Sequence, residues 1–432
     1  MPGRWPSLPA LIPPLVLAVA AIAVRSALVA PAWNQPLHDP DGYLILARSL
    51  ARGDGFVIHD RPTAYRPPLY PMLLAAGLSL GADSERVLVF GLHLALGGAT
   101  AALTFATARR WGLSNPRAWI AGAIVAFDPI LASQARSVMT ETLATFLTAS
   151  ALRLLADAEK KPAWTLASGI ALGACAGALL LASSDAAPWR IRIRRASLLG
   201  LGGLAILGPW GVRNRIEVGA WVWTTTHGGY TLALANNPEY YADVLHGPPG
   251  AVWSGPNQEA FFERVRQETQ GMTESEADGY LAAQGWRMLR ERPGDFLEAS
   301  AARLSRFWAP MPSAAVYGSA LRWACGFWFL PLGVAAIWGA WRRPAWRVPW
   351  IFGIFAAAVL TAVHTIYWTD LRMRAPLTPV IALLAASAGD QRPGGRLGRE
   401  RARRIKSVDP NRAWFRLRLR ALRLFRKNPE PR

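Results

Sequence analysis

Apolar residues along the chain gather into long runs, separated by short segments that are charged or rich in Pro and Gly. Several runs reach about 20 residues with almost no charge, the length a helix needs to cross roughly 30 Å of hydrocarbon. The pattern predicts an all-α polytopic membrane protein with about nine to ten membrane helices. The runs lie at 8–30, 86–108, 118–132, 140–156, 164–184, 196–210, 321–340, 349–367 and 375–388.

Counting membrane crossings from the N-terminus and from the C-terminus gives different answers for the middle of the chain. Counting from the N-terminus places the segment after residue 210 inside, whereas counting back from the C-terminus places 213–320 outside. Either 164–184 is a re-entrant hairpin, or one span is missing between Lys161 and Ala196. The acidic bias of the segment favours the outside placement.

Two shorter patterns predict helices at the outer membrane face. The apolar stretch 68–80 is interrupted by Pro68 and Pro71, which disfavours a full span and favours a helix lying in the interface. Amphipathic helical patterns between 256 and 307 predict a small helical external segment.

Charge is distributed unevenly over the chain, whose formal net charge is +20. The tail 390–432 holds 15 Lys and Arg against 4 Asp and Glu, while 236–300 holds 11 acids against 5 Arg. Because Lys and Arg are retained in cytoplasmic segments, we expect the tail inside and the acidic segment outside. Aromatic residues and Leu interleave with Arg in the tail, which favours an anchor on the anionic lipid bilayer over nucleic-acid binding.

These patterns divide the chain into four parts. We expect an N-terminal transmembrane catalytic core, an external helical segment, C-terminal transmembrane helices and a basic cytoplasmic tail. The predicted ranges are 1–212, with a first outer loop at 31–85, then 213–320, 321–389 and 390–432.

Three acids fall at the predicted outer rim. Asp39 and Asp41 follow the first apolar run, and Glu141 begins the fourth. We expect Asp41 to cap or begin the next helix, which leaves Asp39 free to point into a cavity. Glu141 has two interpretations, a helix N-terminal acid that favours the dipole or a member of a site for a base or a bound cation.

Two arginines, Arg372 and Arg374, precede the last apolar run at the same rim. They have two equally supported interpretations from physical chemistry. Their side chains could extend to lipid headgroups, or their guanidinium groups could bind a phosphate bidentately.

Five motifs occur in order along the chain. The first outer loop reads "HDPDGYLILARSLARGDGF" and then "YRPPLYPMLLAAGLSLG". They are followed by "DPILASQARSVMTETL", "GPWGVRNRIEVGAWVWTTTHGGYTLALANNP" and "LRMRAPLTPVIALLAA". Together these motifs resemble the GT-C-fold glycosyltransferases, in particular bacterial relatives of the protein O-mannosyltransferases and the lipid A aminoarabinose transferase. The resemblance implies a GT-C-like bundle and inverting sugar transfer from a polyprenyl-phosphate donor to a protein, lipid or glycan acceptor.

The resemblance also implies roles for individual residues. Asp39 stands four residues before Tyr43, as the family's catalytic base does, with Asp41 and Glu141 as the other catalytic candidates. Glu141 corresponds to the second acid of the family, so Asp39 and Glu141 are candidates to hold a divalent cation. The implied donor-phosphate ligands are Arg372, Arg374 and Arg66, and the implied sugar or acceptor contacts are Tyr70, His227, Asn236 and Asn237.

Two departures from the family pattern keep alternatives open. The sequence "LLLASSDAAPWRIRIRR" replaces the usual ending of the fifth span, and Met373 stands where the family commonly has an aromatic residue. The alternatives are a membrane transporter or lipid flippase, and a catalytically inactive relative of the same fold. For the enzyme we expect a multi-pass protein of the cytoplasmic membrane, with its active site on the outer face and its C-terminal tail in the cytoplasm.

Overall fold

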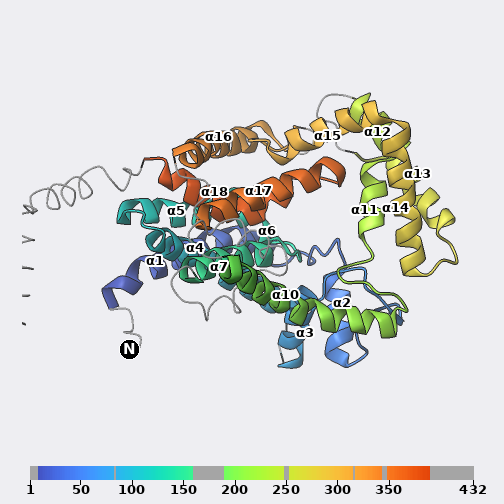
Figure 1. Cartoon of the computed structure of the whole chain (residues 1–432), viewed down its shortest axis with the longest axis horizontal. Coiled ribbons are helices and arrows are strands. Elements are labelled where there is room, and N and C mark those ends of the chain that lie inside the picture. Colours follow the sequence, from blue (N-terminus) through green and yellow to red (C-terminus); the bar gives the residue numbers. More distant parts are fainter. Residues whose placement is uncertain are drawn as a thin grey trace, which may run out of the picture. The chain divides into compact units, whose positions relative to one another are not determined.

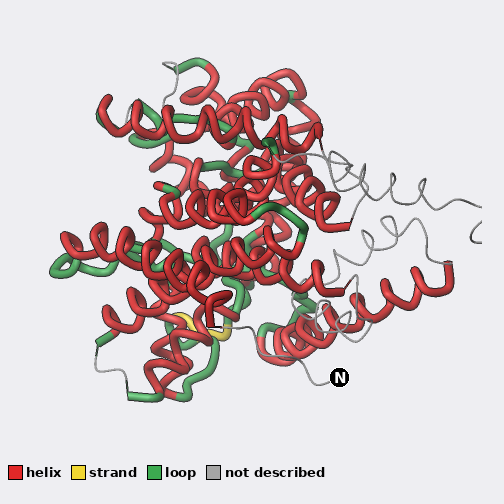
Figure 2. The backbone as a smooth tube through the Cα atoms, turned by 90° about the vertical axis from the view of Figure 1, so that its left-hand side faces the viewer, coloured by secondary structure: helices red, strands yellow, loops and turns green. Residues whose placement is uncertain are grey.

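The computed structural model describes residues 8–81, 84–158, 189–247, 253–314, 317–342 and 348–389. Helices dominate these residues, and one pair of very short strands accompanies them (Figure 2). The predicted run 164–184 and the predicted basic tail 390–432 lie outside the described residues. The choice between a re-entrant hairpin and a missing span therefore stays a prediction, as do the four domain boundaries.

The predicted helical membrane fold is confirmed in its main elements. Among the described residues, three helices are long and apolar enough to cross a membrane, at Pro9–Ala32, Glu85–Arg110 and Ser319–Arg342, and shorter apolar helices accompany them. The helices of the apolar body are α1 (Leu8–Val29), α4 (Glu85–Arg110), α5 (Asn115–Phe127), α6 (Pro129–Gln134), α7 (Glu141–Ala158), α10 (Trp189–Glu217), α16 (Ser319–Arg342), α17 (Val348–Ile366) and α18 (Thr378–Ser387).

Small residues let these helices pack closely. Helix α1 runs along α4, which also packs on α5 and α7, while α18 lies against both α16 and α5 (Figure 1). Ala21, Ala101, Ala121 and Ala382 are fully buried at these contacts. Gly122 has no side chain where Leu17 of α1 approaches, so a Cβ there would collide with it. Close backbone approach of this kind is typical of helices that associate in membranes.

The first outer loop contains a 3₁₀ turn, two short α-helices and a hairpin. They are η1 (Ala30–Ala32), α2 (Tyr43–Arg52), β1 (Val57–Ile58), β2 (Arg61–Pro62) and α3 (Leu69–Ser79). Helix α3 corresponds to the predicted interfacial helix: Leu69 and Met72 are about half exposed, while Tyr70 and Leu74 are buried. The hairpin was not predicted, because each of its strands has only two residues.

The external segment is helical, as predicted, and has its own aromatic core. Its helices are α11 (Gly228–Ala235), α12 (Pro238–Leu245), α13 (Pro256–Glu268), α14 (Glu274–Glu291) and α15 (Pro293–Phe307). Tyr240, Tyr241, Trp253 and Phe261 are almost completely buried together. A 3₁₀ helix, η2 (Leu371–Leu377), follows α17 and leads into α18.

Candidate functional site

Asp39 caps the helix that follows it. Its two carboxylate oxygens accept hydrogen bonds from the backbone N–H groups of Tyr43, at 2.9 Å, and Leu44, at 2.8 Å. The prediction that Asp41 would cap or begin this helix was therefore wrong. The Asp39 side chain, predicted to be free to point into a cavity, is bonded to α2. Gly42 adopts a left-handed conformation with φ of 73° and folds the chain so that Asp39 reaches the first turn of α2.

Asp41 instead forms an ion pair with Arg66. The Arg66 Nη2 lies 2.9 Å from Asp41 Oδ1, and the Arg66 Nε donates to the Asp41 carbonyl at 3.0 Å. The guanidinium also lies over the ring of Tyr65, 4.9 Å from its centroid. Since the two charged side chains retain 13% and 26% of their exposure, the pair is accessible from one side.

Tyr43 connects this pair to the start of α7. Its hydroxyl hydrogen-bonds Thr140 and lies within the electrostatic reach of Asp41, Arg66 and Glu141. Burial raises the pKa of Tyr43 to about 12, against the opposing effect of Arg66. The carbonyl of His38 also accepts a 2.8 Å bond from the Val138 N–H, which fixes the first outer loop beside α7.

Glu141 and Arg372 meet across the fold. Arg372 Nη1 lies 3.1 Å from Glu141 Oε1, and its Nε lies 3.4 Å from Asp370. Glu141 is 8% exposed, and its Oε2 has no hydrogen-bond partner among the described residues. The chain thus places an acid and an arginine from distant segments in contact, a pairing that was not predicted from the sequence.

Arg374 points elsewhere. It is 5% exposed and donates from Nη1 to the carbonyls of Phe307, at 3.3 Å, and Ala309, at 2.7 Å. Its guanidinium also lies 4.5 Å from the centroid of the Phe329 ring. The two arginines of the motif do not form a common clamp, and Arg374 instead stabilises the C-terminal end of α15.

His227 joins the group around Arg66. Its ring lies edge-on to Tyr65 at 4.4 Å and stacks on Tyr230 at 5.2 Å. Burial and, to a smaller extent, the nearby charge of Arg66 lower the pKa of His227 to about 4. The ring is therefore neutral at physiological pH, and its Nδ1 has no hydrogen-bond partner among the described residues.

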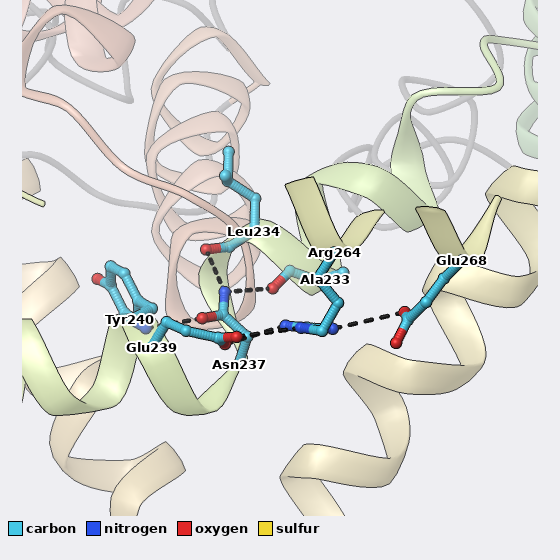
Figure 3. A network of polar contacts seen from close by, with 7 residues as sticks. All are labelled: Ala233, Leu234, Asn237, Glu239, Tyr240, Arg264 and Glu268. Atoms are coloured by element: carbon cyan, nitrogen blue, oxygen red, sulfur yellow. Dashed lines mark hydrogen bonds and ion pairs between the residues drawn. The ribbon is translucent and has the colours of Figure 1, made fainter. Parts of the chain in front are cut away.

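Asn236 and Asn237 are structural residues in this conformation, contrary to the predicted sugar contacts. They are 2% and 4% exposed. The Asn237 Oδ1 caps α12 by accepting from the Tyr240 N–H at 2.7 Å, while its Nδ2 donates to two carbonyls of α11 (Figure 3). Asn236 donates to the carbonyls of Leu232 and Ile366. Both amides use their polar groups internally.

Tyr70 is likewise part of the core rather than a surface for substrate. It is 1% exposed, and its hydroxyl lies 2.8 Å from Nε2 of His93, a fully buried residue of α4. The His93 Nδ1 lies 3.2 Å from the Ala135 carbonyl. Tyr70 also packs edge-on against Tyr43, so it supports the site from behind.

Several site residues gave no clear signal in the sequence. Tyr65, Thr140 and Tyr230 take part in the contacts above, and Glu274 of α14 binds the loop that carries Tyr65. A Thr-x-x-Glu capping pattern at 273–276 does mark the start of α14. Nothing in that pattern indicates that Glu274, inside it, faces the first outer loop.

A preformed cation site does not appear among the described residues, where no three His, Cys, Asp or Glu side chains gather closely enough to hold an ion. Asp39 accepts from two backbone N–H groups, and Glu141 is paired with Arg372. A divalent cation held by these two acids therefore stays a prediction.

The fold is that of multi-pass helical membrane proteins of GT-C type. One solved structure that resembles the chain is "Archaeal oligosaccharyltransferase AglB from Archaeoglobus fulgidus in complex with an inhibitory peptide and a dolichol-phosphate". It is 14% identical, with a TM-score of 0.50, over 87% of this chain and 50% of that one. The chain thus spans about half the length of this neighbour, and the likeness shows the fold alone.

A family comparison gives the more specific assignment. The family described as dolichyl-phosphate-mannose-protein mannosyltransferase matches residues 58–179. The predicted resemblance to this family is confirmed over this segment, which is 122 of the 432 residues. The matched segment contains Arg66, Tyr70 and Glu141. A comparison with curated proteins finds no significant match.

Proposed function

We propose that the chain is a glycosyltransferase that moves a sugar from a polyprenyl-phosphate donor to an acceptor hydroxyl. The observation that carries the proposal is that two ion pairs from separate segments lie within electrostatic reach of each other. Asp41, paired with Arg66, acts on Glu141, which is paired with Arg372. Asp39 stands two residues before Asp41 in the same loop. The family match over 58–179 supports the lipid-phosphate-sugar donor, since the family is named for that chemistry. The neighbour with an inhibitory peptide and a dolichol-phosphate supports the same donor and a peptide acceptor.

In the proposed reaction the acceptor oxygen attacks the anomeric carbon from the face opposite the phosphate. The new C–O bond forms as the bond from carbon to phosphate oxygen breaks, so the anomeric configuration inverts. The acceptor proton passes to a carboxylate, and the polyprenyl phosphate leaves with the bonding electron pair. Two or more groups must therefore face the reacting atoms. A carboxylate that acts as the base lies on the acceptor side, and a cation lies on the phosphate side.

Asp39 is our candidate for the carboxylate that acts as the base. An ionised carboxylate offers about four lone-pair sites, and the two capping bonds from α2 use only two of them. The same bonds fix the direction of the carboxylate, because they tie it to two consecutive N–H groups of one helix. Such a group can orient an acceptor hydroxyl and take its proton without first moving.

Arg372 is our candidate for the cation that binds the leaving phosphate. Its side chain is 29% exposed, and its guanidinium pairs with Glu141 and Asp370 at longer distances than an ideal bidentate contact. A phosphate could displace the contact with Asp370 and still leave Arg372 held by Glu141. Arg66 is the second candidate, although it is already paired with Asp41.

We place the reaction at the outer face of the cytoplasmic membrane. The acidic external segment and the basic tail support this orientation through the retention of Lys and Arg in the cytoplasm. The acceptor remains open between a protein, a lipid and a glycan.

The test is sugar transfer in membranes from a panel of polyprenyl-phosphate sugars. Asp39→Ser is the informative variant, because it removes the carboxylate. Asp39→Asn, which keeps one acceptor oxygen for the N–H groups of α2, separates the loss of the base from the loss of these bonds. We expect transfer by the wild type and a loss of at least about 100-fold in Asp39→Ser, the size of a general-base effect. Asp54→Asn is the matched control, since Asp54 is an exposed acid of the same loop, paired with Arg52.

Other outcomes would redirect the proposal. Equal transfer by Asp39→Ser and wild type would assign the base to Asp41 or Glu141, to be separated by Asp41→Asn and Glu141→Gln. A folded wild-type protein that transfers sugar from no donor would overturn the enzyme proposal and favour the transporter or the inactive relative.

A further inference from the structure

Glu274, in the first turn of α14, binds two other parts of the chain, the first outer loop and the residues before α11. Its Oε2 accepts from the Thr63 hydroxyl at 2.6 Å, and its Oε1 accepts from the Ala64 N–H at 2.9 Å. The Thr226 hydroxyl also donates to Oε1. One carboxylate of the external segment therefore receives three donors, two from the first outer loop and one from the chain before α11.

The bonds to Glu274 continue directly into the site. The Thr63 hydroxyl that donates to Glu274 also accepts from the Tyr65 N–H at 2.9 Å. The Ala64 carbonyl accepts from the Thr226 N–H at 3.1 Å. These two links fix the positions of Tyr65 and of the residue after Thr226, which is His227.

The residues positioned in this way form the outer part of the candidate site. Tyr65 lies against His227 at 4.4 Å, and Arg66, the next residue along the loop, pairs with Asp41 at 2.9 Å. If the segment 63–66 moved away from α14, Arg66 would lose the geometry of its contacts with Asp41. Glu274 itself touches none of these groups.

A second external residue supports the same loop. Arg213, near the end of α10, donates to the carbonyl of Thr63 at 2.6 Å and to that of Phe56 at 2.8 Å. One guanidinium thus binds both ends of the hairpin between Phe56 and Thr63. Arg213 binds carbonyls and Glu274 binds donors, so the two side chains satisfy opposite polar groups of the same backbone.

We propose that Glu274 is a positioning residue, through which the external segment holds the loop that carries Tyr65 and Arg66 in its reactive geometry. This inference rests on the proposed function for its catalytic consequence. An acidic side chain suits the role because an ionised carboxylate only accepts hydrogen bonds, and all three partners donate. A Gln at this position could keep the two bonds to Oε1, but its N–H group would face the Thr63 hydroxyl, which would have to rotate and accept instead of donating.

The test compares Glu274→Gln with Glu276→Gln. Both changes remove one negative charge from the first turn of α14, so their effects on the helix dipole are matched. Glu276 binds only within the capping box, to Thr273, and Gln also serves in that box. Thr226→Val is a milder variant that removes a single donor to Glu274 if Glu274→Gln folds poorly.

Amide hydrogen exchange of residues 56–66 is the readout that does not depend on activity. We expect exchange there to be at least about tenfold faster in Glu274→Gln, with residues 256–268 of the same external segment unchanged and Glu276→Gln like the wild type. Unchanged exchange in residues 56–66 would overturn the positioning role.

Steady-state transfer then tests the catalytic consequence. We expect kcat of Glu274→Gln to fall about 10- to 100-fold, while the KM for the donor changes less than about threefold, because a misplacement near 1 Å can cost 100-fold. Thr226→Val combined with Glu274→Gln should be no worse than Glu274→Gln alone. Faster exchange with an unchanged kcat would overturn the catalytic part. Absence of transfer by the wild type would refute the proposed function instead, and the exchange result would still decide whether Glu274 holds the loop.

Discussion

Replacement of Asn237 by Ala should destabilise the protein rather than weaken its binding of a sugar donor. The substitution removes two kinds of hydrogen bond. The Tyr240 N–H at the start of α12 loses its cap, and the carbonyls of Ala233 and Leu234 at the end of α11 lose the amide that joins the two helices.

The magnitude follows from these contacts. Loss of an N-cap costs about 1 kcal/mol. Ala233 keeps a second donor, the Asn236 N–H at 3.1 Å, but the Leu234 carbonyl loses its amide partner at a site where Asn237 is only 4% exposed. Leaving such a buried acceptor unpaired adds about 1 to 3 kcal/mol. The expected loss in the free energy of unfolding is about 2 to 4 kcal/mol.

Two further variants at this position separate the contributions. Asn237→Ser keeps an acceptor for the cap and should recover about 1 kcal/mol of the loss. Asn237→Asp keeps the cap but places a carboxylate against the α11 carbonyls, so we expect it to be no better than Ala. Asn257→Ala is the matched control, because Asn257 is exposed and bonds only Asp243, and its effect should stay within about 0.5 kcal/mol.

The assay is thermal or denaturant unfolding of the purified protein in detergent, followed by donor KM measured below the unfolding range. An unchanged stability of Asn237→Ala, combined with a raised donor KM, would refute the structural assignment and restore the sugar contact predicted from the sequence. A lower melting temperature with an unchanged donor KM is the expected result.

Two predictions concern the residues around Arg66. The pKa of His227 is lowered to about 4 in the folded state, whereas an unperturbed His has a pKa of about 6.5. Between these two values the unfolded chain binds more protons than the folded one. Stability is therefore lost as pH falls from about 6.5 towards 4. Unfolding from pH 7 to 5 should therefore show a loss of about 1 to 2 kcal/mol that His227→Phe lacks; equal slopes would contradict the assigned burial. Arg66→Lys should lower kcat/KM at least about tenfold, because an ammonium cannot bond both Asp41 acceptors and lie flat on Tyr65. Arg52→Lys, at an exposed pair with Asp54, should match the wild type, and equal effects of both changes would refute the reasoning.

Hydrophobic runs predicted the long helices well. The runs 8–30, 86–108 and 321–340 correspond to α1, α4 and α16, with ends that differ by at most two residues. Length and continuous apolarity are strong signals, since each run is long enough to cross a bilayer by itself. The same signal predicted too long a helix where a polar residue interrupts the run.

Asp128 is the interruption that the hydrophobic pattern hid. The predicted run 118–132 is two helices, α5 and α6, because the Asp128 side chain accepts from the Leu131 N–H at 2.9 Å and Pro129 begins α6. An Asp followed by Pro is a recognised start of a helix. The Asp-Pro pair therefore indicated a helix start, but the length of the apolar run led to the prediction of one continuous helix.

At the site, the sequence predicted the kinds of residue but not their directions. Arg372 and Arg374 are two positions apart in η2, a 3₁₀ helix with about three residues per turn. Their side chains therefore leave the helix in directions about 120° apart, and one cannot predict a shared phosphate clamp from sequence spacing alone. The "NNP" motif was similar: Asn237 before Pro238 indicates a cap, whereas the resemblance suggested a ligand contact.

Arg372 and Arg374 point in different directions and bind different helices. These contacts connect the candidate site to parts of the chain that are far from it in sequence. Arg372 binds Glu141 at the start of α7, while Arg374 binds the carbonyls at the end of α15. Helix α15 is itself held by Arg303, which is fully buried and donates to the carbonyls of Ala235 and Thr365. A buried guanidinium is costly unless its donors are satisfied, so these contacts hold the external helices in one arrangement. That same arrangement delivers Glu274 to the first outer loop, and both sides of the candidate site are therefore positioned by one external segment.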